Sequence, residues 1–75
     1  MERYKNLGGS SGVAAYEIGQ GFLNVQFRDG SIYEYTDQSA GSGNIQRMQQ
    51  LATAGSGLCS FISRVVKAGY ASRHR

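Results

Sequence analysis

The chain has 75 residues, enough for one small domain and too few for two. Its single cysteine excludes an internal disulfide and no histidine–cysteine cluster offers a metal site, so self-association is the most available source of extra stability. No segment reaches the ~20 apolar residues of a membrane span and the N-terminus has no signal-peptide core, so we expect a soluble, cytoplasmic homo-oligomer.

Charge is distributed unevenly along the chain. All five acidic residues lie within residues 1–37. The charged residues of 38–75 are all basic, and the net charge of the chain is +3. A C-terminal half without carboxylates should attract phosphate groups or acidic surfaces. A solvated basic face that only keeps the domain soluble is an equally good interpretation.

A flexible N-terminal arm is predicted for residues 1–12, because glycine and serine dominate its second half. Residues 13–18 alternate weakly between apolar and polar side chains, which predicts a first strand with Ala14, Tyr16 and Ile18 on one face. A turn is then predicted at Gly19-Gln20-Gly21.

A β-hairpin is the clearest prediction. Residues 22–35 (FLNVQFRDGSIYEY) contain two alternating runs, and the length of the loop between them decides their register. A two-residue loop would pair Phe27 with Ile32. A three-residue loop with Gly30 in a left-handed bulge would instead gather the large side chains on one face, in the pairs Leu23–Tyr35, Val25–Tyr33 and Phe27–Ser31. We favour this register because the hydrophobic effect rewards it and it leaves outside Asn24, Gln26, Arg28 and Glu34.

Two amphipathic helices are predicted after a polar connection at residues 37–43. In the first, Ser42 or Asn44 can cap the start, Gly55 can form the end, and the apolar positions are Ile45, Met48, Leu51 and Ala52. In the second, Ser56 is the predicted cap, Gly69 the predicted end, and the apolar positions are Leu58, Phe61, Ile62, Val65 and Val66. Residues 70–75 are predicted to be a frayed basic tail.

Together these elements predict an α+β fold with the order β-β-β-α-α. A three-stranded antiparallel meander with one apolar face needs a cover, and the two helices are the cover available. The predicted domain therefore spans residues 13–69 and has two layers.

An ordered set of residues resembles the KTSC family. The set consists of Ser10-Ser11, Tyr16, Leu23-x-Val25-x-Phe27, Gly30, Tyr33-x-Tyr35, Ala54-x-Ser56, Phe61 and Val65. These short domains stand alone in bacteria and their phages or occur at the C-terminus of some lysyl-tRNA synthetases, and the tyrosine pair matches the family's central YxY. The proline segment that usually follows this pair is missing here. The family has no established enzymatic function, so the resemblance implies a non-catalytic KTSC-like domain, for which RNA binding has been suggested.

The residue types present do not favour catalysis. Nucleophilic chemistry needs a base beside the nucleophile, and the only histidine, His74, lies in the predicted tail. Cys59 stands at the start of the second helix, where a dipole can activate a thiol, although a buried inert thiol is commoner. Glu17 and Glu34 are interpreted as surface residues rather than a catalytic pair. We expect no cofactor and no metal.

Glycine-rich helix starts give the strongest functional signal. The sequences at 41–44 (GSGN) and 55–57 (GSG) each precede a predicted helix, whose first amides and dipole favour an anion. No lysine follows as in a Walker loop, and glycines that only separate two helices are the alternative interpretation. The tyrosines are interpreted as core residues or as a stacking surface for a base. The predicted ligand-binding residues are Ser42, Gly43, Asn44, Arg47, Ser56, Gly57, Arg64, Lys67, Tyr33 and Tyr35.

Three functions are consistent with these features. We prefer a non-enzymatic module that captures a nucleotide or another phosphate-bearing small ligand, which by analogy would suit sequestration of a signal molecule by a phage-type relative. The second is RNA binding through the basic half, and the third is docking on an acidic protein partner. Affinity that grows with oligonucleotide length and falls steeply with salt would favour RNA, whereas saturation by mononucleotides would favour a small-ligand pocket.

Overall fold

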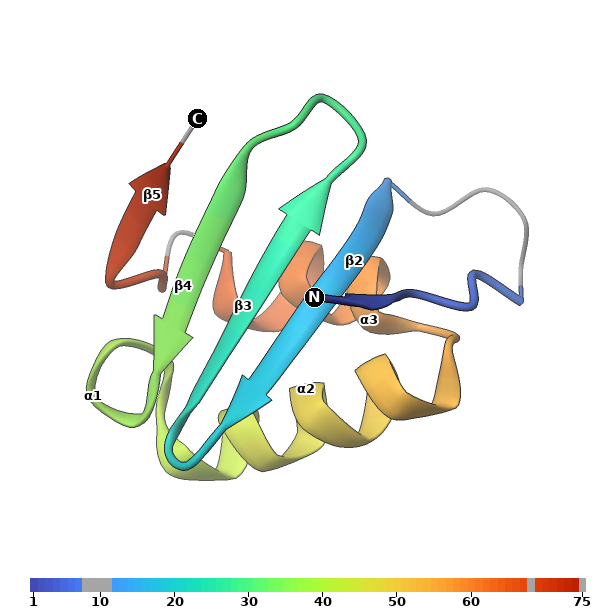
Figure 1. Ribbon diagram of the computed structural model, residues 1–75. Helices are drawn as coiled ribbons and strands as arrows, with labels where there is room; N and C mark the ends of the chain where they lie inside the picture. The colour runs from blue at the N-terminus through green and yellow to red at the C-terminus, as the bar shows by residue number, and fades with distance from the viewer. Residues whose placement is uncertain (8–11, 68, 75) are drawn as a thin grey trace.

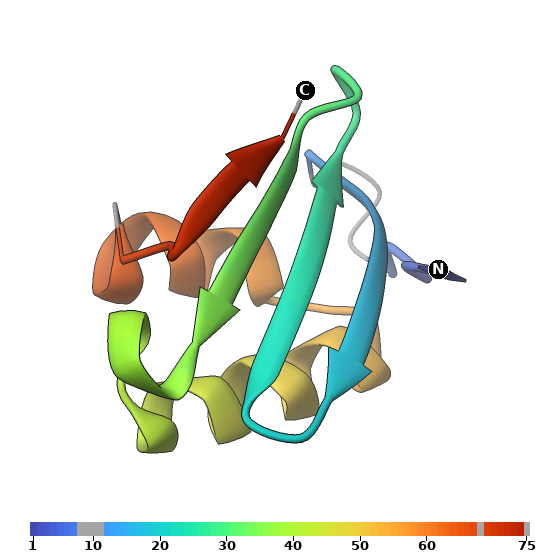
Figure 2. The same cartoon turned by 60° about the vertical axis from the view of Figure 1, so that its left-hand side comes forward.

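The computed structural model describes residues 1–7, 12–67 and 69–74. The strands are β1 (Glu2–Arg3), β2 (Val13–Gly19), β3 (Phe22–Phe27), β4 (Ile32–Thr36) and β5 (Ser72–His74). The helical segments are α1 (Asp37–Ala40), α2 (Ser42–Ala54), α3 (Leu58–Phe61) and the π-helical turn η1 (Ile62–Val66). The strands form one antiparallel sheet in sequence order, and α2, α3 and η1 lie together on one face of it (Figure 1, Figure 2). The α+β class is confirmed, with five strands instead of three.

The central hairpin has the predicted three-residue loop. Leu23 pairs with Tyr35 and Val25 pairs with Tyr33, while the Phe27 N–H donates to the carbonyl of Ser31 over 2.9 Å. Gly30 closes the loop with a φ of +93°, a conformation that side chains with a Cβ rarely adopt. Because directly paired residues share a face, Leu23, Val25 and Tyr35 all face the helices and are buried.

Strand β2 contains an irregularity that the alternation pattern did not predict. The register shifts between Val13 and Ala15, so that Val13 pairs with Phe27 while Tyr16 pairs with Val25. A bulge of this kind changes which residues point inward along the strand. As a result Val13, with an exposed fraction of 1%, is the buried residue at this end of β2 in place of the predicted Ala14.

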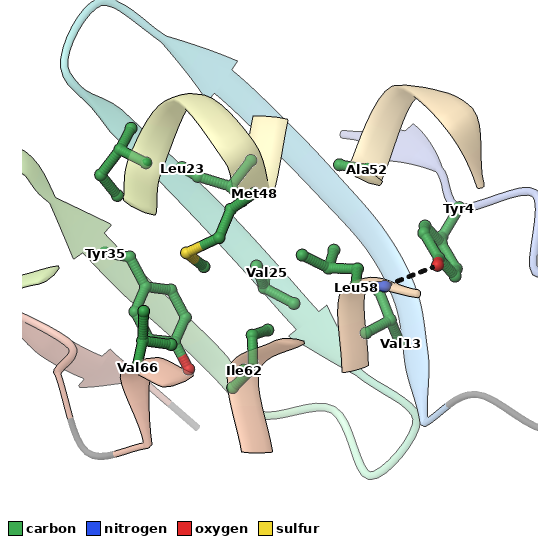
Figure 3. Packing of buried hydrophobic residues seen from close by; sticks show 11 residues of the cluster. Tyr4, Val13, Leu23, Val25, Tyr35, Met48, Ala52, Leu58, Ile62 and Val66 are labelled. Atoms are coloured by element: carbon green, nitrogen blue, oxygen red, sulfur yellow. Dashed lines mark hydrogen bonds between the residues drawn. The ribbon is translucent and has the colours of Figure 1, made fainter. Parts of the chain in front are cut away.

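The prediction of a flexible arm for residues 1–12 is wrong for the part before residue 8. Residues Glu2–Arg3 form β1 beside β2, and the next residue, Tyr4, is only 4% exposed. Its phenol oxygen accepts a hydrogen bond from the Leu58 N–H over 3.3 Å (Figure 3). Leu7 then donates its N–H to the carbonyl of Gly55 over 2.8 Å. We call residues 2–7 the N-terminal strap. The strap therefore joins the sheet to the α2–α3 junction.

The predicted frayed tail is also wrong, because Ser72–His74 pair with β4 as the strand β5. The connection into β5 is fixed by the Ala71 N–H, which donates to the carbonyl of Glu34 over 2.6 Å. The predicted boundaries of 13–69 were consequently too narrow. Both added strands are short and polar, so they have no alternation of apolar residues by which a sequence pattern could reveal them.

Helix α1 occupies part of the segment that was predicted to be a polar connection. Thr36 and Ser39 form a capping box, in which each side chain accepts a hydrogen bond from the other residue's N–H, at 3.1 and 3.0 Å. The helix α2 that follows begins after Gly41, which has no side chain to act as a cap. Ser42 and Asn44 therefore do not cap α2 as predicted, and the Asn44 amide instead donates to the carbonyl of Ala40 over 2.7 Å. The predicted end of α2 at Gly55 is confirmed, with a φ of +79°.

The second predicted helix exists but differs in its geometry and ends. It begins after Gly57 without a side-chain cap, so Ser56 is not the cap, and it ends at Val66 instead of near Gly69. Its second half is the π-turn η1, closed by the hydrogen bond from the Lys67 N–H to the carbonyl of Ile62 at 2.6 Å. The wider turn leaves Val65 50% exposed, although an α-helical pattern predicts that it is buried.

One hydrophobic core lies between the sheet and the helices (Figure 3). Every helical segment from α2 onward contributes to it, as do the strap and three strands, through Tyr4, Val13, Leu23, Val25, Tyr35, Ile45, Met48, Ala52, Leu58, Ile62 and Val66. Gln49 anchors α2 to the β2–β3 turn, because its amide donates to the carbonyls of Gly19 and Phe22, both at 3.0 Å. Among the described residues, no helix has the length and apolar character needed to cross a membrane.

Candidate ligand-binding site

A pocket of about 510 Å³ opens between the loop end of the β3–β4 hairpin and the helical segment α3–η1. This volume lies within the range of ~300–1,000 Å³ that is typical of sites for small molecules. The hairpin contributes one wall, the helical segment contributes the other, and Gly12 also lines the pocket. The remaining lining residues are Phe27, Arg28, Asp29, Ser31, Tyr33 and Tyr35 on the hairpin side, and Cys59, Ile62, Ser63 and Lys67 on the helical side.

The hairpin loop presents a fixed carboxylate to this pocket. The Asp29 Oδ1 accepts two hydrogen bonds from Ser31, one from the backbone N–H at 2.9 Å and one from the hydroxyl at 2.6 Å. Ser31 is only 2% exposed, so the group that holds Asp29 is itself immobilised by packing. The loop therefore holds the Asp29 carboxylate in a defined conformation, and its exposed neighbour Arg28 also lines the pocket.

The opposite wall ends at Lys67, whose backbone is unusual. Its φ is +48° and its ψ is −113°, a combination outside the regions that residues with a Cβ normally occupy. Lys67 also closes the π-turn, a rare helix variant that is frequently found at functional sites. Backbone strain of this kind costs of order 1–3 kcal/mol and occurs preferentially at ligand-binding positions. Two local irregularities thus coincide at the one lysine that lines the pocket.

The inner part of the pocket is aromatic. Tyr33 contacts three other rings, at centroid distances of 5.2 Å to Phe27, 4.9 Å to Tyr70 and 6.5 Å to Tyr35. The first two contacts are edge-to-face and the third is stacked, which are favourable arrangements for aromatic rings. The Arg73 guanidinium carbon lies 5.5 Å from the centre of the Tyr33 ring, within reach of a cation–π interaction. We call the rings of Phe27, Tyr33, Tyr35 and Tyr70 the aromatic cluster.

Tyr35 is the most deeply placed member of the aromatic cluster, at 1% exposed. Burial raises the pKa of Tyr35 to about 12, because the core disfavours a phenolate, and ionisation of Tyr33, Tyr70 or Cys59 nearby would add a like charge. The hydroxyl therefore stays protonated and serves as a neutral polar group in the pocket.

Alkaline titration should reveal this burial. We expect one of the five tyrosines to ionise with a midpoint near pH 12, against 10.0 for an ordinary phenol, when phenolate absorbance is followed. Because the pKa is higher in the folded than in the unfolded chain, the contribution to stability is complete below pH 10 and is lost as the pH rises towards 12. The variant Tyr35→Phe should lack the late phase. A wild-type titration with a single phase near pH 10 would contradict the expectation.

Of the predicted ligand-binding residues, the pocket brings together Tyr33, Tyr35 and Lys67. Arg64 is exposed on η1 but does not line the pocket, and Arg47 is exposed on α2, where its guanidinium donates to the Gln50 side chain over 3.4 Å. The basic residues predicted to support one anion site are therefore dispersed over different parts of the surface.

The two glycine-rich corners are separated in space. Ser42 and Gly43 stand at the start of α2, while Ser56 and Gly57 follow its end, and 13 helical residues span about 20 Å. Asn44 lies one residue further into α2. A small ligand cannot contact both corners across that distance. The glycines here begin and end helices, which is the alternative interpretation given above.

Sequence reasoning missed the pocket residues of the hairpin loop and of the helical wall. These are Arg28, Asp29, Ser31, Cys59, Ile62 and Ser63, of which Cys59 is considered above only as a reactive thiol. The predicted strand register does point to Arg28, Asp29 and Ser31, because it places the hairpin loop directly beyond the sheet face that carries Phe27 and Tyr33. No signal indicated which helix lies opposite this loop, since that depends on tertiary packing.

His74 has a different setting from the predicted frayed tail. It lies on β5, where its Nε2 is 3.2 Å from the Ser72 hydroxyl, and that hydroxyl donates to the Glu34 carboxylate at 3.2 Å. A serine hydroxyl has one proton, so with this proton directed to Glu34 the imidazole donates to Ser72 and does not act as its base. On the same face Glu17 accepts from Asn24, which lies between the two glutamates in the strand register. No group of metal-binding side chains occurs within residues 1–7, 12–67 and 69–74.

Comparisons of the chain with protein-family models, with curated proteins and with solved structures found no match. The resemblance to the KTSC family therefore stays a prediction, as does the homo-oligomer. Two of the residues that support the resemblance, Ser10 and Ser11, lie outside the described residues.

Proposed function

We propose that the chain is a non-enzymatic binding module that captures a nucleotide-type ligand, with a planar ring and a phosphate group, in the pocket between the hairpin and η1. The main support is that one pocket combines an aromatic interior with Lys67 in its strained conformation. A KTSC-like domain without catalytic activity would be consistent with this function.

The aromatic cluster supplies the part that would bind the ring. Phe27 and Tyr33 line the pocket and are half-buried, so each retains accessible ring surface beside the opening. A base that stacks on an aromatic side chain gains about 1–3 kcal/mol, with little preference among bases. The protonated Tyr35 hydroxyl can donate a hydrogen bond to a ring nitrogen or a carbonyl of the ligand.

The two basic side chains of the lining supply the part that would bind phosphate. Arg28 extends from the hairpin wall and Lys67 from the helical wall, and both are exposed at the rim. Hydrogen bonds between cations and phosphate contribute about 1.5–3 kcal/mol each. In the described lining no histidine accompanies the thiol of Cys59, which supports binding rather than nucleophilic catalysis.

The charge pattern favours a small ligand over RNA. The uncovered face of the sheet is where an RNA strand would find the most room, but Glu17 and Glu34 lie on that face in one row with Asn24. Carboxylates there would repel a phosphate backbone. Arg28, Lys67 and Arg73 are instead grouped around the pocket and the aromatic cluster.

Isothermal titration calorimetry with the four ribonucleoside 5′-monophosphates tests the proposal. We expect saturable binding of at least one of them at one site per chain, and binding of the matching nucleoside that is weaker by about tenfold or more because the phosphate contacts are lost. The matching nucleoside is the control for ring stacking alone, and a short single-stranded RNA is the control for backbone binding.

Absence of binding by all four monophosphates would overturn the proposal. Binding of RNA alone, with affinity that falls steeply as salt increases, would support the RNA-binding alternative in its place.

A further inference from the structure

We infer that the Tyr35 hydroxyl selects the ring of the ligand, because it favours a ring with a hydrogen-bond acceptor at its edge over a hydrocarbon ring. This role rests on the proposed function and adds a specificity-determining residue to it. Every nucleobase has such an acceptor, a ring nitrogen or a carbonyl oxygen, whereas a phenyl or naphthyl group has none.

The Tyr35 hydroxyl forms no hydrogen bond with the described residues, although the side chain is only 1% exposed. Burial of a hydroxyl without a partner is unfavourable, so such groups are rare in folded proteins. In the described part of the chain, no side-chain oxygen or nitrogen that is shut off from solvent lacks a partner. The Tyr35 oxygen is therefore not shut off, and because Tyr35 lines the pocket, the hydroxyl opens into it.

Aromatic and apolar contacts fix the position of this hydroxyl. The Tyr35 ring is stacked with Tyr33 at a centroid distance of 6.5 Å and is edge-to-face with Tyr70 at 6.3 Å. Its hydroxyl end points towards the helical segment, beside the buried residues Ile62 and Val66 (Figure 3). Close packing of this kind prevents the ring from swinging out to solvent. Only water or a group that enters the pocket can then form a hydrogen bond with the hydroxyl.

The difference in burial assigns the two ends of the ligand. Arg28 and Lys67 are exposed, so a phosphate group bound to them keeps part of its hydration, whereas Tyr35 is buried and suits the ring. Burial raises the pKa of Tyr35 to about 12, so the hydroxyl keeps its proton at neutral pH and can donate it. A ring edge with an acceptor takes this hydrogen bond. A C–H edge displaces water from the hydroxyl and leaves it unpaired, which lowers affinity.

Calorimetric titration of wild type and Tyr35→Phe tests this role. The probes are the four ribonucleoside 5′-monophosphates and naphthyl phosphate, which has a planar ring and a phosphate group but no acceptor on the ring. Each monophosphate that binds wild type should bind Tyr35→Phe about fivefold or more weakly, because one hydrogen bond is lost. Naphthyl phosphate should bind Tyr35→Phe at least as tightly as wild type. Tyr16→Phe, the same change at a half-buried tyrosine outside the pocket lining, should keep the wild-type affinities.

Thermal denaturation of the ligand-free protein separates a binding role from a structural one. The hydroxyl has no partner among the described residues, so Tyr35→Phe should melt at the same temperature as wild type or at a higher one. A lower melting temperature, together with an equal loss of affinity for the nucleotide and for naphthyl phosphate, would show that the change disturbs the whole pocket. That result would overturn the selective role of Tyr35.

The wild-type affinities are informative even if Tyr35→Phe does not fold. Naphthyl phosphate that binds wild type as tightly as the nucleotides do would overturn the selection of the ring. Unchanged affinity for the nucleotides in a folded Tyr35→Phe would also overturn the role of Tyr35 and leave the proposed function intact. Failure of all four monophosphates to bind wild type would overturn the proposed function together with this role.

Discussion

Replacement of Tyr4 by alanine should lower the free energy of unfolding by about 3–5 kcal/mol, the usual cost of removing a large buried aromatic side chain. Tyr4 is 4% exposed, belongs to the core and accepts a hydrogen bond from the Leu58 N–H at the start of α3. A chain of this size has a total stability of about 4–11 kcal/mol, so the variant should lose a large share of it. Urea denaturation followed by circular dichroism measures the change.

Two further variants separate the contributions of Tyr4. Tyr4→Phe keeps the ring and removes the acceptor, so it should cost about 1–3 kcal/mol through the unpaired Leu58 N–H. Leu7→Ala, in the same strap but 70% exposed, is the matched control and should change stability by less than about 0.5 kcal/mol. A loss of less than about 1 kcal/mol in Tyr4→Ala would show that the strap does not stabilise the core.

Replacement of Lys67 by glycine should weaken monophosphate binding by about tenfold or more, because a charge-assisted contact with phosphate is lost. The same change should raise the melting temperature. The φ of +48° is unfavourable for lysine and is readily adopted by glycine, so relief of strain should add about 1 kcal/mol of stability. Calorimetry measures the first effect and thermal denaturation the second.

The combination of greater stability and weaker binding distinguishes a binding role from a structural one. Arg64→Ala is the matched control, because Arg64 is an exposed cation on the same turn that does not line the pocket, and its loss should leave binding unchanged. Equal effects of the two variants on affinity would show that only the overall positive charge matters and that the pocket is not the site. Unchanged binding in Lys67→Gly would remove Lys67 from the site.

The sequence predicts the hairpin and the buried side and end of α2 well, because these depend on strong local patterns. Alternation on both sides of Asp29-Gly30 set the register in which Leu23 faces Tyr35. Helical spacing in α2 identified Ile45, Met48 and Ala52 as buried residues, and Gly55 marked the helix end. In each case the residues that determine the structure are close in sequence.

The edges of the sheet could not be predicted in this way. Tyr4 is a single aromatic residue in a polar segment, so nothing periodic indicates that it is buried, and β5 consists of the polar residues Ser72–His74. Both segments also depend on contacts with residues more than 30 positions away, such as Tyr4 with Leu58 and Ser72 with Glu34. The π-turn was missed for a different reason, since an α-helical spacing fits Leu58 to Val66 equally well.

The candidate site was predicted in part. Tyr33, Tyr35 and Lys67 are predicted from aromatic stacking and positive charge, and they line one pocket. The glycine-rich corners were chosen for their local helix-start chemistry, and the length of α2 separates them. Asp29 is predicted only as a turn residue and Arg28 as a residue of the outer face, because the pocket that they share with Lys67 depends on how η1 packs beside the hairpin.

The two ends of the chain form the two outermost strands of the sheet, β1 and β5. Any shortened chain limited to the segment that sequence patterns identify as the domain would lose both. The backbone amides and carbonyls of β2 and β4 would then face water or another molecule, the condition in which β-sheet proteins pair edge to edge and aggregate. Trimming of either terminus, or the attachment of a bulky tag directly beside Glu2 or His74, would therefore be expected to lower solubility as well as stability.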